Sequence, residues 1–218
     1  MERVFPGRAP WRVNDFTAAE IARLDAGSWF GTAYAGARVP TLKQYLRRVD
    51  LHRQKLLLEL KNPELYPGIE RETLKLLGNE GWLDGRHRSR LIVQSFSAAS
   101  LRTVHDLKPG VKTAFLGTPS VAKLHTYAVF ADQINPSYTS VSRAYVSAVH
   151  AFTGPHDKPL EVFALTVDTA DAARRVAGYG VDGIITDKPD AVRDALRGQR
   201  AVRAGRRVLS VAARTVVA

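Results

Sequence analysis

The chain has 218 residues, enough for one substantial α/β domain, and its apolar fraction of 45% is ordinary for a soluble globular protein. It contains no cysteine, which excludes disulfides, thiolate nucleophiles and zinc sites built on sulfur. No apolar run reaches the roughly 20 residues that a membrane span needs, and the N-terminus lacks a signal peptide's apolar core. We therefore expect a cytoplasmic location by default, although a longer product could be exported.

The formal charge of +11 is concentrated toward the C-terminus. No acidic residue follows Asp194, whereas six arginines do, at positions 197, 200, 203, 206, 207 and 214. Basic tails can bind nucleic acid, but this one lacks interleaved aromatic residues and any nucleic-acid-binding module. We therefore predict a basic C-terminal tail over residues 199–218, solvated or partly helical, and no nucleic-acid partner.

The first predicted segment, residues 1–55, is helical and loop-like and has no strand candidate. Thr17 and Glu20 form a capping box, which predicts a short helix that ends near Gly27. A second capping box, formed by Thr41 and Gln44, predicts a helix with one apolar stripe. This segment leads directly into the first strand.

Short apolar runs alternate with helical periodicity over residues 56–198, which is the pattern of successive βαβ units. The sequence predicts six strands, at residues 56–61, 91–96, 112–117, 128–135, 161–167 and 183–187. Strands that are apolar on both faces belong to a parallel sheet covered by helices, and ligands bind such sheets at the carboxyl ends of the strands. We therefore expect a partial β/α barrel with its site at those ends.

The first strand ends in Glu59 and Lys61, two opposite charges spaced two residues apart. Side chains alternate between the faces of a strand, so these two project from the same face at the strand's tip. Two interpretations remain open at this point. The pair is either part of a binding site or a loop-facing ion pair that contributes little to stability.

Polar residues also follow the other predicted strands, as a ligand pocket in this architecture requires. These tips are Gln94-Ser95-Phe96, Gln133-Ile134-Asn135-Pro136, Thr166-Val167-Asp168 and Thr186-Asp187-Lys188-Pro189.

Two other patterns carry no site. Gly178 to Gly183 matches G-x-G-x-x-G, but it precedes a strand, whereas dinucleotide binding needs it to open a helix. The six histidines show no metal-ligand spacing, and we expect His105, His150 and His156 to be surface or packing residues.

Several of these motifs resemble the glycerophosphodiester phosphodiesterase family. The matching stretches are Ala26-Gly27-Ser28-Trp29-Phe30, Leu58-Glu59-Leu60-Lys61, Val93-Gln94-Ser95-Phe96, Ile134-Asn135-Pro136 and the closing signature Val181-Asp182-Gly183-Ile184-Ile185-Thr186-Asp187-Lys188-Pro189. The resemblance runs from about Asp15 to the helix after Pro189, and the closing signature is its most specific part.

The resemblance implies a TIM-barrel-like (β/α)8 fold of the phospholipase-C-like phosphodiesterase type. It also implies a divalent cation, Ca²⁺ or Mg²⁺, and hydrolysis of glycerophosphodiesters to glycerol 3-phosphate and an alcohol. By the same resemblance, Glu59 is a metal ligand and Lys61 contacts the phosphate. Ser95, Phe96, Leu165 and Asp187 are then candidate pocket-lining residues, with Leu165 standing where the family usually has Trp.

The family's first two strands, which carry a His-Arg-Gly and a Glu-x-Asp motif, have no counterpart in this sequence. They supply the catalytic histidines, so no catalytic residue is assigned, and we expect the polypeptide alone to have little or no diesterase activity. We also expect two exposed sheet edges, through which the chain could self-associate. The alternative is a degenerate barrel that binds phosphate or a partner without catalysis.

Overall fold

The computed structural model describes residue 7 and residues 11–200, 210–213 and 215–217. The chain divides into two compact units, Met1–Gln54 and Lys55–Val217. Among the described residues, no helix is both long enough and apolar enough to cross a bilayer.

The N-terminal unit contains η1 (Val13–Asp15), α1 (Ala18–Ile21), η2 (Thr32–Tyr34) and α2 (Leu42–Leu51). Both predicted capping boxes are confirmed, with Thr17 capping α1 and Thr41 capping α2. The prediction that the first helix continues to Gly27 is wrong. It ends at Ile21, because the Asp25 carboxylate accepts hydrogen bonds from the Gly27 and Ser28 amides and draws the chain into a loop.

The second unit contains one parallel sheet. Its first six strands are β1 (Leu56–Leu60), β2 (Leu91–Ser95), β3 (Lys112–Leu116), β4 (Gln133–Asn135), β5 (Glu161–Ala164) and β6 (Gly183–Thr186). They lie side by side in chain order, and each pairs in parallel with the next. The predicted βαβ series is thereby confirmed.

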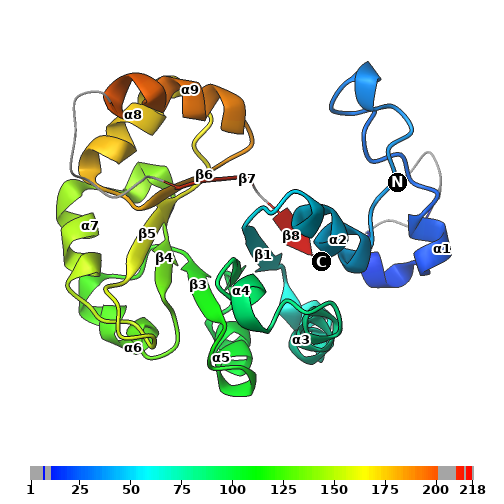
Figure 1. Cartoon of the computed structure of the whole chain (residues 1–218), viewed down its shortest axis with the longest axis horizontal. Helices are drawn as coiled ribbons and strands as arrows, with labels where there is room; N and C mark the ends of the chain where they lie inside the picture. Colours follow the sequence, from blue (N-terminus) through cyan, green and yellow to red (C-terminus); the bar gives the residue numbers. More distant parts are fainter. Residues whose placement is uncertain (1–6, 8–10, 201–209, 214, 218) are drawn as a thin grey trace. The chain divides into compact units, whose positions relative to one another are not determined.

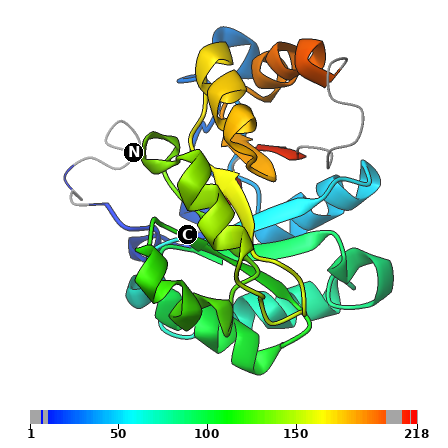
Figure 2. The same cartoon turned by 90° about the vertical axis from the view of Figure 1, so that its left-hand side faces the viewer.

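Helices follow most strands and lie on the outer side of the sheet, as Figures 1 and 2 show. They are η3 (Pro63–Leu65), α3 (Ile69–Asn79), α4 (Gly85–Arg88), α5 (Ala98–Leu107), η4 (Val121–Lys123), α6 (Leu124–Ala128), η5 (Tyr138–Ser140), α7 (Arg143–His150), α8 (Ala170–Tyr179) and α9 (Pro189–Arg200). The sequence also predicts helix starts at Ser97, Thr169 and Pro189. These are confirmed, because Ser97 caps α5, Thr169 caps α8 and Pro189 is the first residue of α9.

Four strands end one residue before their predicted ends, and β4 and β5 are shorter than predicted by three or more residues. The fourth strand was expected over 128–135, but Ala128 ends α6 and β4 begins only at Gln133. The Phe130 and Ala131 amides both bond back to the Tyr127 carbonyl, so they are not available to a strand ladder. Periodicity cannot separate a buried strand from a buried turn in a short apolar run. Likewise, β5 ends at Ala164 instead of Val167.

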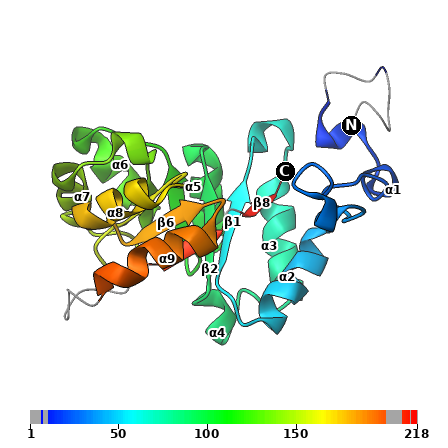
Figure 3. The same cartoon turned by 90° about the horizontal axis from the view of Figure 1, so that it is seen from above.

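In the predicted tail, residues 199–200 end α9, but the other described residues form strands and not a solvated tail, which corrects that part of the prediction. These strands are β7 (Ser210–Ala213), which pairs in parallel with β6, and β8 (Thr215–Val217), which pairs in parallel with β1. The sheet order is therefore β7-β6-β5-β4-β3-β2-β1-β8, and Figure 3 shows β8 beside β1.

This pairing also corrects the expectation that β1 and β6 are the exposed edges, because β8 and β7 now stand at the two ends of the sheet. The outer strands of the six-stranded series, β1 and β6, both gain a backbone partner from one short stretch of chain. The argument for self-association through these edges therefore no longer holds, because their backbone donors and acceptors are already engaged.

The sheet has apolar residues on both faces. The larger cluster lies between the sheet and its outer helices and includes Ile134, Val162 and Ile184. A smaller cluster on the opposite face joins Leu57, Phe163 and Ile185, with Ile92 and Leu165 packed against it. We call this smaller cluster the inner apolar layer. Residues two positions further along each strand lie on the same inner face, closer to the carboxyl ends of the strands.

Candidate functional site

Glu59 lies on the inner face near the carboxyl end of β1, two residues after Leu57 of the inner apolar layer. It is only 1% exposed, and its register partner on β2 is Gln94, which is also 1% exposed. A carboxylate in such a place must be balanced by polar or charged neighbours, because burying an isolated charge is very costly. The tip of β1 is therefore a polar site.

An amide pair adjoins Glu59. Asn135, the last residue of β4, donates a hydrogen bond of 3.1 Å from Nδ2 to Gln94 Oε1. Asn135 is fully buried, and its Oδ1 accepts no hydrogen bond from the described residues. The tips of β1, β2 and β4 thus bring one carboxylate and two amides to the same end of the inner face.

The other predicted site residues on this face come from the strand tips. Lys61 and Asp187 are exposed and follow β1 and β6 directly, while Phe96 follows β2 and is 56% exposed. Leu165 follows β5 and packs against the inner apolar layer. Leu165 therefore lies on the inner face. Lys61, Phe96 and Asp187 each stand two residues after an inward residue, so we expect alternation to place them there as well.

Ser95 lies elsewhere. It is adjacent to Gln94 on β2, so it faces the opposite side of the sheet. Its hydroxyl donates to the Leu60 carbonyl at 2.7 Å and accepts a hydrogen bond from the Ser97 amide. These contacts tie the ends of β1 and β2 to the start of α5.

Asp168 has a role that the sequence did not reveal. Its Oδ1 accepts hydrogen bonds of 2.9 Å from both the Thr186 hydroxyl and the Asp187 amide. The carboxylate therefore joins the chain after β5 to the end of β6 and fixes the backbone that carries Asp187. The only sequence signal was that all three residues belong to the predicted polar strand tips.

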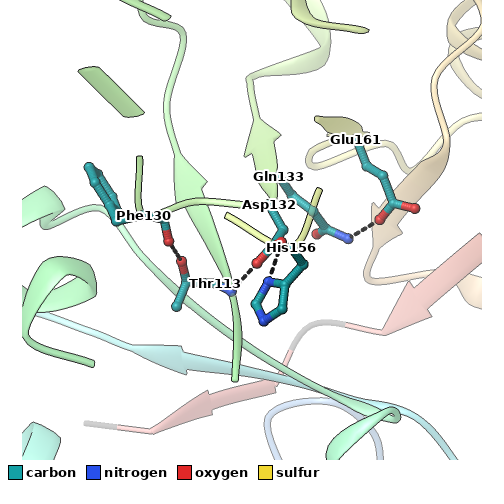
Figure 4. Close-up of polar contacts among 6 residues, drawn as sticks. All are labelled: Thr113, Phe130, Asp132, Gln133, His156 and Glu161. Atoms are coloured by element: carbon teal, nitrogen blue, oxygen red, sulfur yellow. Dashed lines mark hydrogen bonds and ion pairs between the residues drawn. The ribbon is translucent and has the colours of Figure 1, made fainter. Parts of the chain in front are cut away.

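Two histidine–aspartate pairs occupy the opposite, amino-terminal end of the sheet. His156 Nδ1 lies 2.7 Å from Asp132 Oδ1, and Asp132 Oδ2 accepts the Thr113 amide, as Figure 4 shows. His150 Nε2 lies 2.7 Å from Asp182 Oδ2, an oxygen that also accepts the Val162 amide. Each aspartate directly precedes a strand and holds the start of the neighbouring strand.

These pairs are far along the strands from the Glu59 end, so the two histidines are structural, as the sequence indicated. Figure 4 also shows Gln133, whose Nε2 donates to Glu161 Oε2 at 2.7 Å. Both residues begin their strands. The inner face therefore has a second polar contact at its amino end, separate from the candidate site.

Known families clarify what this geometry represents. The glycerophosphoryl diester phosphodiesterase family model matches residues 1–191. The chain belongs to this family. Within it, the buried Glu59 and the exposed Lys61 lie on the stretch that resembles the family's Ile-Glu-x-Lys strand.

Related proteins agree with this family. The chain is 35% identical over 186 residues to the YhdW protein of Bacillus subtilis. The aligned region covers 83% of this chain and 71% of that protein. It is 32% identical over 205 residues to a glycerophosphodiester phosphodiesterase of the same organism, covering 85% of this chain and 66% of the relative.

Solved structures show the same fold. A phosphodiesterase of Oleispira antarctica in complex with the product sn-glycerol-3-phosphate matches with a TM-score of 0.73 and 22% identity, over 86% of this chain and 73% of that one. A glycerophosphodiester phosphodiesterase of Parabacteroides distasonis matches with a TM-score of 0.66 and 21% identity, over 84% and 72%. The expected fold, a partial barrel of the (β/α)8 type, is confirmed.

Members of the glycerophosphoryl diester phosphodiesterase family generally use a divalent cation, and the donors at the β1 tip fit one in kind. Hard cations select carboxylate and amide oxygens, which Glu59 and Asn135 provide. The donors are fewer than a metal site usually has, because no group of three His, Cys, Asp or Glu side chains lies together within the part of the chain that the structure describes. The site offers a single buried carboxylate.

Proposed function

We propose that this chain contributes the metal- and phosphate-binding end of a glycerophosphodiester site, in a hydrolase that releases glycerol 3-phosphate and an alcohol. The observation that carries the proposal is the burial of Glu59 near the carboxyl end of β1, with the exposed Lys61 directly after the strand, in a chain of this family. The names of the relatives and the product bound in the Oleispira antarctica structure support it.

The residues have distinct proposed roles. Glu59 would hold Ca²⁺ or Mg²⁺, with the Asn135 amide oxygen at the same end of the inner face as a candidate second ligand, and the bound ion would polarise a phosphoryl oxygen. The ammonium group of Lys61 would offset the negative charge that accumulates on the phosphoryl oxygens during cleavage. Phe96 and Leu165 would line the apolar side of the pocket, and Asp187 its rim.

Binding of glycerol 3-phosphate, measured by calorimetry with Ca²⁺ or Mg²⁺ and again with chelator, tests the site. Glu59→Gln should weaken the metal-dependent part of the binding at least tenfold, on the order of the 1.5–3 kcal/mol of a charged interaction. Glu161→Gln is the matched control, because Glu161 is a carboxylate at the amino end of the inner face. Equal losses in both variants, or none in either, would contradict the assignment.

A second candidate function is phosphate binding without catalysis. It is favoured by the location of the two histidine–aspartate pairs, which lie at the amino end of the sheet and are engaged with strand starts. An acid/base group normally contributes roughly 10²- to 10⁴-fold to such a reaction. None is assigned at the Glu59 end.

Hydrolysis of glycerophosphocholine separates the two candidates. Turnover that chelator and Glu59→Gln both abolish supports the hydrolase. Binding of glycerol 3-phosphate without turnover supports the binding protein. A chain that neither binds nor cleaves contradicts both.

A further inference from the structure

A compact loop in the N-terminal unit, residues 25–38, presents aromatic side chains to solvent; we call it the aromatic loop. Its two ends are joined, because Asp25 and Arg38 form an antiparallel bridge and the Ala26 amide donates to the Ala37 carbonyl at 2.7 Å. Compact loops with closed ends are frequently functional.

The inside of the aromatic loop is held by the Asp25 carboxylate. It accepts hydrogen bonds from the amides of Gly27, Ser28 and Gly36 and from the Ser28 hydroxyl, at 2.7–2.9 Å. These bonds, that from the Ser28 hydroxyl first, lower the pKa of Asp25 well below its usual range. At Gly27 a Cβ would overlap the Tyr34 carbonyl, so only glycine fits. The loop is therefore built as one fixed shape.

Three large aromatic side chains project from this frame. Trp29 is 82% exposed, Phe30 63% and Tyr34 54%. Phe30 packs edge-on against both others, with its ring centroid 5.7 Å from that of Trp29 and 5.1 Å from that of Tyr34. The indole N–H donates to the Ala26 carbonyl within the loop. Such a contiguous exposed aromatic group marks an interaction surface.

The charges around the aromatic loop indicate what kind of surface it meets. Residues 26–37 contain no charged side chain, and no acidic residue occurs between Asp25 and Asp50. Arginines stand on both sides, and Arg38 Nη1 donates to the Arg23 carbonyl, which brings the two flanks together at the loop's base. The base therefore carries two arginines against the one carboxylate of Asp25. An uncharged aromatic tip above a base of net positive charge is complementary to an anionic surface with an apolar interior.

We propose that the aromatic loop docks this protein on anionic phospholipid bilayers, with Trp29 and Phe30 inserted at the headgroup level. Trp and Tyr favour this interface, where an amphipathic ring meets both water and apolar chains. The arginines at the base add attraction to anionic headgroups, which salt screens. The inference is independent of the proposed diesterase site.

Sedimentation with vesicles of phosphatidylcholine, with or without phosphatidylglycerol, tests the docking. The chain should bind the anionic vesicles more strongly, and added salt should weaken the binding. Trp29→Ala combined with Phe30→Ala should reduce binding at least about tenfold, given what burial of a large aromatic side chain contributes. Leu51→Ala is the matched control, because Leu51 is an apolar residue of the same unit that is 72% exposed.

A second measurement uses the intrinsic tryptophan fluorescence, and its variant keeps an aromatic side chain at position 29. Brominated lipids should quench the tryptophan emission of the wild-type chain, and Trp29→Phe should remove that quenching, although Trp11 and Trp82 remain. Failure to bind anionic vesicles at low salt would overturn the proposal. Equal vesicle binding by the double variant and the wild type would also overturn it, and would assign the attraction to the arginine-rich C-terminal segment. Capture of a protein partner by the loop, without vesicle binding, would overturn it as well.

Discussion

Asn135 Nδ2 donates to Gln94 Oε1 across the inner face of the sheet, from β4 to β2, without any contribution from the β3 strand between them. The residue of β3 that is level with Gln94 is Ala114, which has a small side chain, and the one level with Asn135 is Leu116. Both amides are almost completely buried, so this hydrogen bond satisfies a donor and an acceptor that have little access to water.

We expect Gln94→Leu and Asn135→Leu each to lower the free energy of unfolding by about 1–3 kcal/mol, because each leaves a buried polar group without its partner. The double variant should cost clearly less than the sum of the two, since it leaves neither amide behind. Urea denaturation of the wild type and the three variants measures this cycle. Strict additivity would show that the two amides do not act as a pair.

Substituting the two members of the Asp132–His156 pair, at the opposite end of the sheet, should lower the free energy of unfolding by unequal amounts. Asp132→Ala removes the acceptor of both His156 and the Thr113 amide and should cost about 2–3 kcal/mol. His156→Ala should cost about 1 kcal/mol, because the Thr113 amide keeps its acceptor. Urea midpoints compare the two variants, and a larger loss for His156→Ala would contradict this account.

Deleting residues 210–218 should expose the edges of β1 and β6 that β8 and β7 now pair. The expected loss of stability is on the order of 1 kcal/mol for each ladder hydrogen bond removed. The shortened chain should also self-associate, because unpaired edges accept strands from other copies. Light scattering and urea denaturation test this. A monomeric shortened chain with an unchanged midpoint would mean that β7 and β8 contribute nothing.

The lowered pKa of Asp25 predicts an acid-sensitive aromatic loop. A carboxylate whose pKa is lower in the folded than in the unfolded chain stabilises the fold fully above the unfolded pKa, about 3.9. That contribution falls as the pH drops below this value toward the folded pKa. The Gly27, Ser28 and Gly36 amides should therefore lose hydrogen-exchange protection in acid, as NMR can follow. Asp25→Asn should show no such pH dependence.

Two glycines in the second unit form a matched pair. A Cβ at Gly183 would lie 2.5 Å from the Phe163 ring, whereas one at Gly178 would meet nothing within 4 Å. Gly183→Ala should destabilise by about 1–3 kcal/mol through overpacking. Gly178→Ala, within α8, should stabilise by roughly 0.5–1 kcal/mol. Thermal unfolding ranks the two, and the opposite order would contradict the close contact of Gly183 with Phe163.

Local sequence patterns were sufficient to predict much of the fold. The capping boxes at Thr17 and Thr41 and the caps at Ser97 and Thr169 were readable because a cap depends on residues three positions apart. The six strands were readable because a buried strand is a short apolar run. Strand ends were less certain, as at β4, where the Tyr127 carbonyl takes the amides that would have extended it.

The sequence by itself determined the family, the order of the parallel strands and the presence of Glu59 and Lys61 at a strand tip. These depend on alternation and on neighbouring residues, which the chain states directly. Only the tertiary structure decided the rest. The Gln94–Asn135 pair joins residues 41 apart, and the pairing of β8 with β1 joins residues 157 apart, as from Leu58 to Thr215. Such contacts depend on how the sheet brings distant segments together, and no local pattern records that.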